Sequence, residues 1–187
     1  LSNSGELQWR KQIADVNQIT TSTDKDENIY TAWSRNSYHT EETRGSFIGK
    51  LNPDNGEIVW KTELESHNYI INDLHAVGNT LYAVGQYKGT KRPLFIAVNL
   101  NDGTLLWQKE VAASDSTAFT EIDSDGSNLY VSSKSALGIS GTVHQFNLDG
   151  SVVEAWNGSD RQKLSRTNTQ DQTSVIVGNQ IISAGKT

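Results

Sequence analysis

A phrase that recurs four times constrains the fold of this chain more than any other feature. Its clearest copy, LNPDNGEIVW at 51–60, returns as NLNDGTLLW at 99–107. A weaker copy begins with NLDGSVV at 147–153, and a shortened one, SGELQW, stands at 4–9. The turn glycines occupy positions 5, 56, 103 and 150, at successive spacings of 51, 47 and 47 residues. A fixed period of this size is typical of solenoids, propellers and arrays.

A second phrase recurs at 27–32, 78–84, 126–131 and 178–183, and in each copy an Asn precedes a short apolar run. Further runs lie between the phrases, rich in β-branched and aromatic residues and bounded by Gly, Asn and Asp. Asn-Gly and Asp-Gly favour hairpin turns, because those turns need positive φ. The pattern therefore predicts strands joined by tight turns, and no stretch shows convincing helical periodicity.

Each unit is predicted to hold four antiparallel strands, here termed A to D in chain order, as in a β-propeller blade. The expected fold is all-β, with a partial blade at 1–15, blades at 16–65, 66–112 and 113–157, and a partial blade at 158–187. The predicted strands are 16–21, 28–34, 46–51 and 57–64, then 70–77, 80–86, 94–100 and 104–111, then 119–123, 128–133, 142–148 and 152–156, and finally 173–177 and 180–184.

The strand inventory predicts an incomplete propeller. Four A, four B and four D strands are expected but only three C strands, since the chain begins inside a C–D hairpin and ends after a B strand. A closed propeller needs about four to eight blades. We therefore expect further blades outside this chain, or a homo-oligomer in which two copies share a ring, and favour a piece of a larger propeller.

The segment SFIGKLNPDNGEIVW at 46–60, preceded by DKDENIY at 24–30, resembles the bacterial β-propeller repeat family called SBBP. It is more distantly similar to quinoprotein-like, or PQQ-like, propeller repeats. The resemblance extends over nearly the whole chain and implies the propeller fold. Quinoprotein enzymes carry a similar Gly-to-Trp docking phrase, with cofactor ligands and often paired cysteines. This chain has no cysteine and so departs from that enzymatic branch.

Charge and composition narrow the expected partners. The net charge of −6 leaves no basic stripe for nucleic acid or an anionic membrane surface. No apolar run is long enough to span a membrane, so membrane insertion is not expected. Only 20% of residues are charged, and Ser, Thr, Asn and Gln provide most of the polarity, as is common in secreted and cell-surface proteins. We expect a secreted or surface location, with the periplasm as the alternative.

Tryptophans at positions 9, 60 and 107 hold the same place in three copies of the phrase. A repeated Trp is typical of an apolar anchor between blades whose indole N–H reaches a carbonyl. We therefore expect Trp60 and Trp107 to be buried at equivalent positions.

An acidic turn offers alternate oxygen ligands at Asp123, Asp125 and Asn128, as calcium loops do. The segment 24–28 resembles it, but the Glu that ends a twelve-residue calcium loop is missing. The alternative is a metal-free A–B turn in which Asp and Asn bond their own backbone. Calcium and the metal-free turn both stay open, and no organic cofactor is expected.

Three A-strand residues, Asp73, His75 and Glu121, are predicted to line the propeller channel. Asp73 and His75 are two residues apart and would point to the same side of a strand, where they could bind an ion or polar ligand or stand solvated. No nucleophile–base pair is evident, and the histidines lack metal-site spacing. We therefore predict no enzymatic activity, with a piece of a propeller hydrolase, lyase or quinoprotein as an alternative.

The B–C and D–A loops differ most between units and share one face in propellers of this class. Variable loops on a rigid scaffold often bind partners, and Tyr and Arg are common in interface hot spots. The predicted ligand site comprises Tyr38, His39, Tyr69, Tyr87 and Arg92, although a merely solvated rim is the alternative. An extracellular protein or glycan suits these loops. The predicted function is a non-enzymatic binding, adhesion or structural module, and an outer-membrane assembly scaffold is a further alternative.

Overall fold

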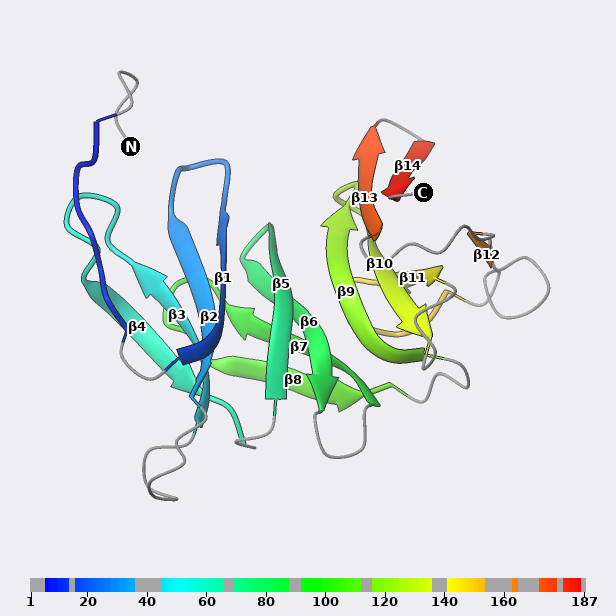
Figure 1. Cartoon of the computed structure of the whole chain (residues 1–187), viewed down its shortest axis with the longest axis horizontal. Coiled ribbons are helices and arrows are strands. Elements are labelled where there is room, and N and C mark those ends of the chain that lie inside the picture. Colours follow the sequence, from blue (N-terminus) through cyan, green and yellow to red (C-terminus); the bar gives the residue numbers. More distant parts are fainter. Residues whose placement is uncertain are drawn as a thin grey trace.

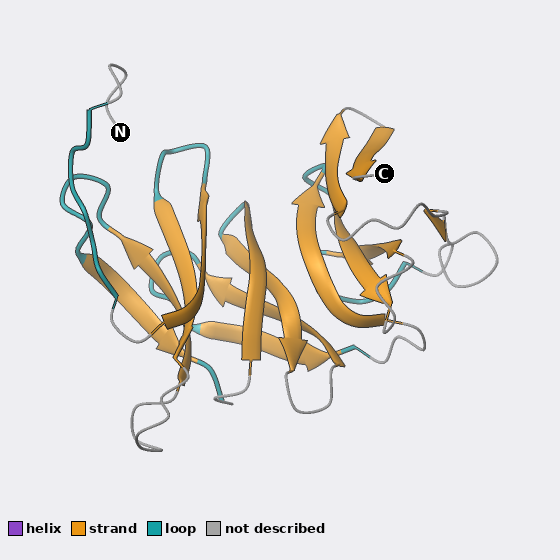
Figure 2. Cartoon of the chain, viewed as in Figure 1, coloured by secondary structure: helices purple, strands orange, loops and turns teal. Residues whose placement is uncertain are grey.

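Strands form all the regular secondary structure that the computed structural model describes (Figure 2). The described residues are 6–13, 16–35, 45–65, 69–87, 92–111, 116–135, 141–153, 163–164, 172–177 and 180–185. The expected all-β fold is confirmed. Within these ranges there is no helix long and apolar enough to cross a membrane.

The described strands form three four-stranded antiparallel sheets and one two-stranded sheet (Figure 1). The first blade holds β1 (Val16–Thr23), β2 (Ile29–Arg35), β3 (Gly45–Leu51) and β4 (Ile58–Glu63). The second holds β5 (Tyr69–Val77), β6 (Thr80–Tyr87), β7 (Arg92–Asn99) and β8 (Leu105–Glu110). The third holds β9 (Ser116–Ser124), β10 (Asn128–Ser135), β11 (Gly141–Asn147) and β12 (Lys163–Leu164), and β13 (Gln172–Val177) pairs with β14 (Gln180–Gly185).

Consecutive strands are neighbours in every sheet, so each blade is a meander from A to D, as the repeat predicts. Figure 1 shows β1, β5 and β9 side by side in front, with β4 and β8 crossing behind them. The A strands of successive blades pack against one another, whereas the D strands lie at the outer edges. The right-handed twist of each sheet turns the outer strands across the inner ones.

Two predicted D strands differ from the structure. Residues 6–13 form no strand, because the described chain offers them no C strand as a partner. In the third blade Val152 makes only a single bridge, to Phe146, and the fourth strand is β12, beyond the expected blade end at 157. The turn before Val152 closes from the N–H of Asn147 to the carbonyl of Ser151, one residue sooner than its counterpart from Asn99 to Thr104.

The hydrophobic core lies between the blades. Side chains alternate along each strand, so a central strand sends successive residues toward the blade before it and the blade after it. Leu81 and Ile96 of the second blade pack with Tyr30 and Ile48 of the first. Phe95, on the other face, packs with rings of the third blade, Phe119 and Phe146.

Each repeated tryptophan packs on the turn glycine of the following blade. Gly103 has φ of 74°, and a Cβ built on it would lie 2.5 Å from the Trp60 ring. The Trp60 indole Nε1–H donates to the carbonyl of Leu100 at 3.1 Å, and the Thr62 hydroxyl donates to the carbonyl of Gly103. Glycine is therefore required twice at this position, for the left-handed backbone and for the ring above it.

The same arrangement holds at the neighbouring interfaces. Trp107 covers Gly150, whose φ is 75°, and Trp9 covers Gly56, whose φ is 70°. The Trp9 indole Nε1–H donates to the carbonyl of Pro53 at 2.6 Å. The expectation that Trp60 and Trp107 are buried is corrected, because both are only half-buried. They lie on outer D strands, so each ring covers the next blade's turn and leaves part of its surface exposed.

Replacing Gly103 with Ala should destabilise the fold more than replacing Gly78 with Ala. Both glycines have positive φ, but a Cβ on Gly78 would meet nothing within 4 Å. Gly78→Ala should therefore cost about 1 kcal/mol, from backbone strain alone. Gly103→Ala should cost about 1–3 kcal/mol more, because the Trp60 ring must move. Denaturant unfolding of both variants measures the difference, and equal losses would contradict the docking.

Candidate binding surfaces at the propeller axis and the loop end

Polar side chains join the inner strands of the three blades. The Gln18 amide Nε2–H of β1 donates to the carbonyl of Ile71 at 3.2 Å and to Oδ1 of Asn72 at 3.1 Å on β5. The Asn72 Nδ2–H donates in turn to the carbonyl of Phe119 on β9, at 2.6 Å. A chain of side-chain amides therefore crosses from the first blade to the third.

A β-bulge places Asn72 for this contact. In the pairing of β5 with β6, Ile71 faces Gly85 and Asp73 faces Val84, which leaves Asn72 as the extra residue. A side chain on Gly85 would overlap the carbonyl oxygen of Ile70, so the bulge needs glycine opposite it. β9 has a corresponding bulge, in which Thr120 is the extra residue.

Asp73 connects the second and third blades. Its Oδ1 accepts the N–H of Leu74 at 2.9 Å, and its Oδ2 accepts the N–H of Ile122 on β9 at 3.0 Å. Burial raises the pKa of this carboxyl, and the two backbone hydrogen bonds oppose that rise. Both oxygens thus bond the main chain, so a structural role accounts for Asp73.

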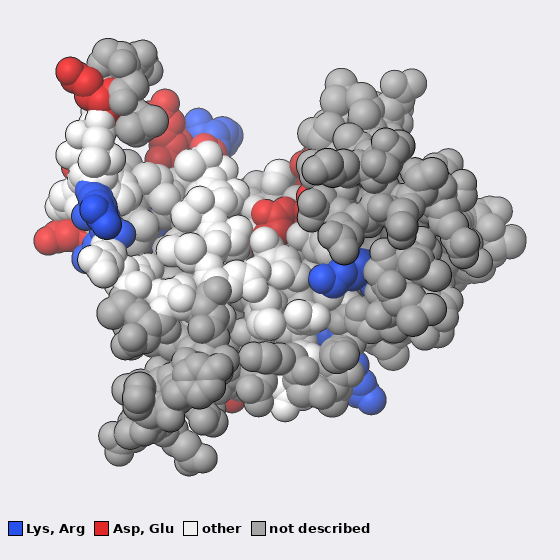
Figure 3. Space-filling view, in the orientation of Figure 1, with Lys and Arg blue, Asp and Glu red and all other residues white. Residues whose placement is uncertain are grey.

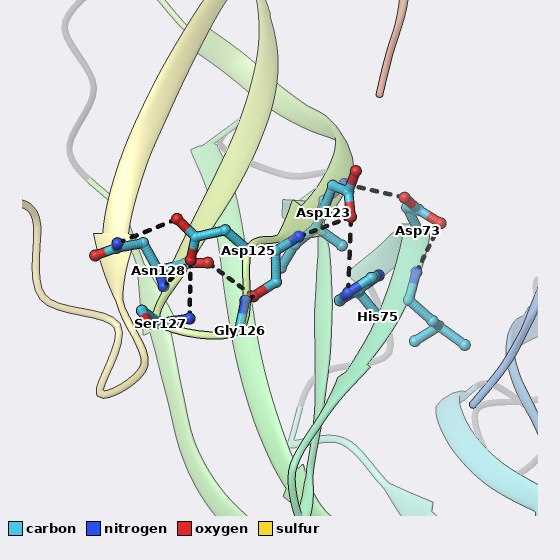
Figure 4. Close-up of polar contacts among 10 residues, drawn as sticks. Asp73, His75, Asp123, Asp125, Gly126, Ser127 and Asn128 are labelled. Carbon is cyan, nitrogen blue, oxygen red and sulfur yellow. Dashed lines mark hydrogen bonds and ion pairs between the residues drawn. The ribbon is translucent and has the colours of Figure 1, made fainter. Parts of the chain in front are cut away.

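His75 of β5 faces Asp123 of β9, with 3.7 Å between Nε2 and Oδ1 (Figure 4). Both side chains are partly exposed. Figure 3 shows acidic side chains gathered beside β5 and β9 on a face that is otherwise mostly uncharged over β1 and β5. Glu121 lies on the same inner strand β9. The sequence placed Asp73 and His75 on one strand but could not show that His75 meets Asp123 across the blade interface.

The predicted calcium residues separate into two groups. Oδ1 of Asp125 accepts the N–H groups of Ser127 and Asn128, each at 2.8 Å, and Oδ2 accepts the hydroxyl of Tyr130 at 2.9 Å. These hydrogen bonds lower the pKa of Asp125. Asp123 instead turns toward His75 (Figure 4).

The corresponding turn of the first blade has the same construction, with Asp24 bonded to Asn28 and Tyr30. Neither turn needs an ion to close. Over the ranges that the structure describes, no three or more His, Cys, Asp or Glu side chains are grouped to hold a metal ion. Calcium binding at Asp123, Asp125 and Asn128 stays a prediction.

Asp125→Ala should lower stability by about 1–2 kcal/mol near neutral pH, because it removes charge-assisted hydrogen bonds from an exposed turn. A carboxyl with a lowered folded pKa stabilises the fold above its unfolded pKa of 3.8, and that stabilisation is lost as pH falls through the folded value. The difference between wild type and variant should therefore shrink in acid. Unfolding curves at several pH values measure it.

Asp54→Ala provides the matched control, since Asp54 is also an exposed turn carboxylate. It should cost less stability near neutral pH, because within the described residues no hydrogen bond to its carboxylate is found. Adding calcium to wild type and Asp125→Ala separates the two alternatives for this turn. A calcium-dependent rise in unfolding midpoint confined to the wild type would support the metal site, and a pH-independent cost of Asp125→Ala would contradict the hydrogen-bonded turn.

Three predicted loop residues meet at one end of the second blade. Tyr87 ends β6 opposite Tyr69 of β5 and Arg92 of β7. The two tyrosine rings pack edge to face, with centroids 5.5 Å apart. Arg92 lies 3.6 Å from Glu110, measured from Nη1 to Oε2, and its side chain is 64% exposed.

Tyr69 lies beneath this site and is not part of its exposed surface. It is only 6% exposed, and its hydroxyl accepts the Gln108 Nε2–H at 2.7 Å. Its predicted role as a contact residue is therefore replaced by packing beneath Tyr87. Tyr38 and His39 lie outside the described residues. Tyr87 and Arg92 remain as the candidate contact residues at this end.

A serine–histidine contact was missed by the sequence analysis. Oγ of Ser133 lies 2.9 Å from Nε2 of His144, and it also bonds the carbonyl of Thr142 at 3.2 Å. The two residues are diagonal neighbours on β10 and β11, so only the strand register brings them together. Ser133 is 3% exposed, which leaves its hydroxyl without the access that a nucleophile needs. The contact instead holds the His144 ring against Phe119.

The fold and these blade contacts define a segment of a PQQ-like β-propeller. The chain belongs to the family described as outer membrane protein assembly factor BamB, which matches residues 1–187. The expected PQQ-like resemblance is thereby confirmed. The closer resemblance to SBBP repeats stays a prediction.

A solved relative shows the same fold. The crystal structure of BamB from Moraxella catarrhalis superposes with a TM-score of 0.56 at 15% sequence identity. The alignment covers 97% of this chain and 47% of that one, so this chain spans about half the length of the solved protein. No curated protein sequence matches the chain.

Proposed function

We propose that this chain is a non-enzymatic, protein-binding part of a propeller that acts as a scaffold in outer membrane protein assembly. The family description supports a role in outer membrane protein assembly. It also favours a periplasmic location at the outer membrane over secretion or display on the cell surface. The propeller then serves as a rigid support, and binding depends on the side chains at its ends and edges.

The pairing of Tyr87 with Arg92 at the loop end of the second blade carries this proposal. The two residues are cross-strand neighbours, and Arg92 extends a mostly exposed cation beside an aromatic ring. Tyr69 packs against the Tyr87 ring from the adjacent strand, which restricts its motion. A contact pair held in place before binding loses little side-chain entropy on association.

A protein suits this site better than a glycan does. Tyr and Arg are the residue types that dominate protein–protein hot spots, and Glu110 beside Arg92 adds an opposite charge that selects among partners. The family description, which concerns the assembly of proteins, points the same way. Nucleic acid stays disfavoured by the net charge of −6.

The polar contacts inside the blades support a non-enzymatic role. Asp73 is engaged by two backbone amides, and Ser133 is enclosed. The carboxylate of Asp73 and the hydroxyl of Ser133 are therefore engaged in contacts that stabilise the fold.

Site-specific photocrosslinking in cells that express the whole protein tests the proposed site. A photoreactive residue at position 87 should give adducts with envelope proteins, which mass spectrometry identifies. The same residue at position 25, an exposed turn at the opposite end of a blade, should give few. Adducts of equal yield and identity from both positions would contradict the proposed site.

Replacing Tyr87 and Arg92 together with Ala should weaken binding of a partner identified in this way by at least about tenfold, because each truncation at a hot spot removes about 1–4 kcal/mol. Lys25→Ala is the control, since Lys25 is exposed and pairs only with the adjacent Asp26 in the described part of the chain. Titration calorimetry measures both affinities. Unchanged affinity in the double variant, with its unfolding midpoint preserved, would place the contact elsewhere.

A further inference from the structure

Among the described strands none pairs with the outer edge of the second blade, where backbone groups lie beside an exposed apolar side chain. We propose that β8 binds an extended polypeptide segment as an added β-strand, and that β4 offers an equivalent edge in the first blade. This surface shares Glu110 with the ion pair at the loop end, but its outward backbone groups and Leu106 are not part of the loop-end site. It does not depend on the proposed function.

The register shows which backbone groups are open. The N–H of Val111 donates to the carbonyl of Pro93 on β7, so the backbone groups of Val111 point toward β7. In an antiparallel pair the N–H and C=O groups of every second residue point the same way. Lys109 and Trp107 therefore pair toward β7, whereas the N–H and C=O groups of Gln108 and Glu110 point outward. In the first blade the N–H of Leu64 bonds the carbonyl of Ser46, which leaves the corresponding groups of Lys61 and Glu63 pointing outward.

An exposed apolar side chain stands at the start of each edge. Leu106 is 49% exposed and Val59 is 57% exposed, and both are the extra residue of a β-bulge at the same place in the repeat. The bulge turns Trp107 and Trp60 toward the next blade, but that backbone geometry does not require an apolar side chain. Gln8 holds the same place in the first copy of the phrase. The apolar residues at 59 and 106 are therefore available for a partner.

The edge is rigid because the opposite face of β8 is anchored. Trp107 packs on Gly150, and the Lys109 ammonium donates to the carbonyl of Asp149 at 2.7 Å. An edge already fixed in the extended conformation gains backbone hydrogen bonds from a partner without paying for its own ordering.

Charge and pattern define the occupant. Glu110 and Glu63 stand at the same repeat position, four residues after the exposed Leu106 and Val59, and Glu110 also lies 3.6 Å from Arg92. An added strand should therefore place an apolar residue beside Leu106 and a basic residue beside Glu110. A second copy of this edge fits poorly, since antiparallel self-pairing would set Glu110 against Leu106.

The test uses a fluorescent eight-residue peptide of alternating valine and threonine, with one lysine four residues from a valine. We expect wild-type protein to bind it, measured by fluorescence anisotropy. Gln108→Pro should weaken binding at least tenfold because proline lacks the outward N–H, which an edge strand can lose without breaking its own ladder. Gln108→Ala is the matched control, since both variants lose the hydrogen bond to Tyr69. Leu106→Gln should also weaken binding.

Amide hydrogen exchange in the wild-type protein gives a second readout, which does not require the proline variant to fold. The amides of Gln108 and Glu110 should become protected when the peptide binds, while those of Trp107 and Lys109, already bonded to β7, change little. Absence of peptide binding, equal affinity of Gln108→Pro and Gln108→Ala, or binding without protection at 108 and 110 would each overturn the proposal. Loss of photocrosslinks at position 87 would leave it unaffected.

Discussion

The structure depends on the docking of each D-strand tryptophan onto the turn glycine of the next blade. A four-stranded blade is apolar on both faces, so it is stable only between neighbours. The docking fixes how those neighbours meet: Trp60 needs the bare backbone of Gly103, and Gly103 needs positive φ to turn the chain beneath the ring. The repeat period follows from this contact, because the glycine and the tryptophan belong to one phrase but act on different blades.

A second set of contacts joins the blades at the axis, where Gln18, Asn72 and Asp73 each reach a neighbouring blade. The blades are therefore joined in two places. Tryptophans join them near the rim, and amide and carboxylate side chains join them near the axis. Two surfaces of the second blade take no part in these contacts between blades. They are the loop end with Tyr87 and Arg92, and the outer edge of β8. The proposed scaffold role and the proposed strand-binding edge rest on these two surfaces.

The repeat predicted most of the fold, because turn glycines and apolar runs are local signals. Strands of the first two blades lie within two residues of their expected bounds, and the tryptophan anchors have the expected partners. The contacts between the candidate site residues could not be predicted from the sequence. His75 meets Asp123 across a blade interface, and Ser133 meets His144 diagonally, so each depends on register and blade angle. The third D strand was misplaced because its shortened turn weakens the phrase that marked the others.

A double-mutant cycle between Trp60 and Gly103 tests the central role of docking most directly. Free energies of unfolding are measured for wild type, Trp60→Ala, Gly103→Ala and the double variant. If the ring is the main group that excludes a side chain at 103, Gly103→Ala should lose at least about 1 kcal/mol of its cost once Trp60 is absent, leaving the backbone strain and the contact with the Thr62 hydroxyl. Costs that add to within about 0.5 kcal/mol would show the two residues to be independent and would contradict the account.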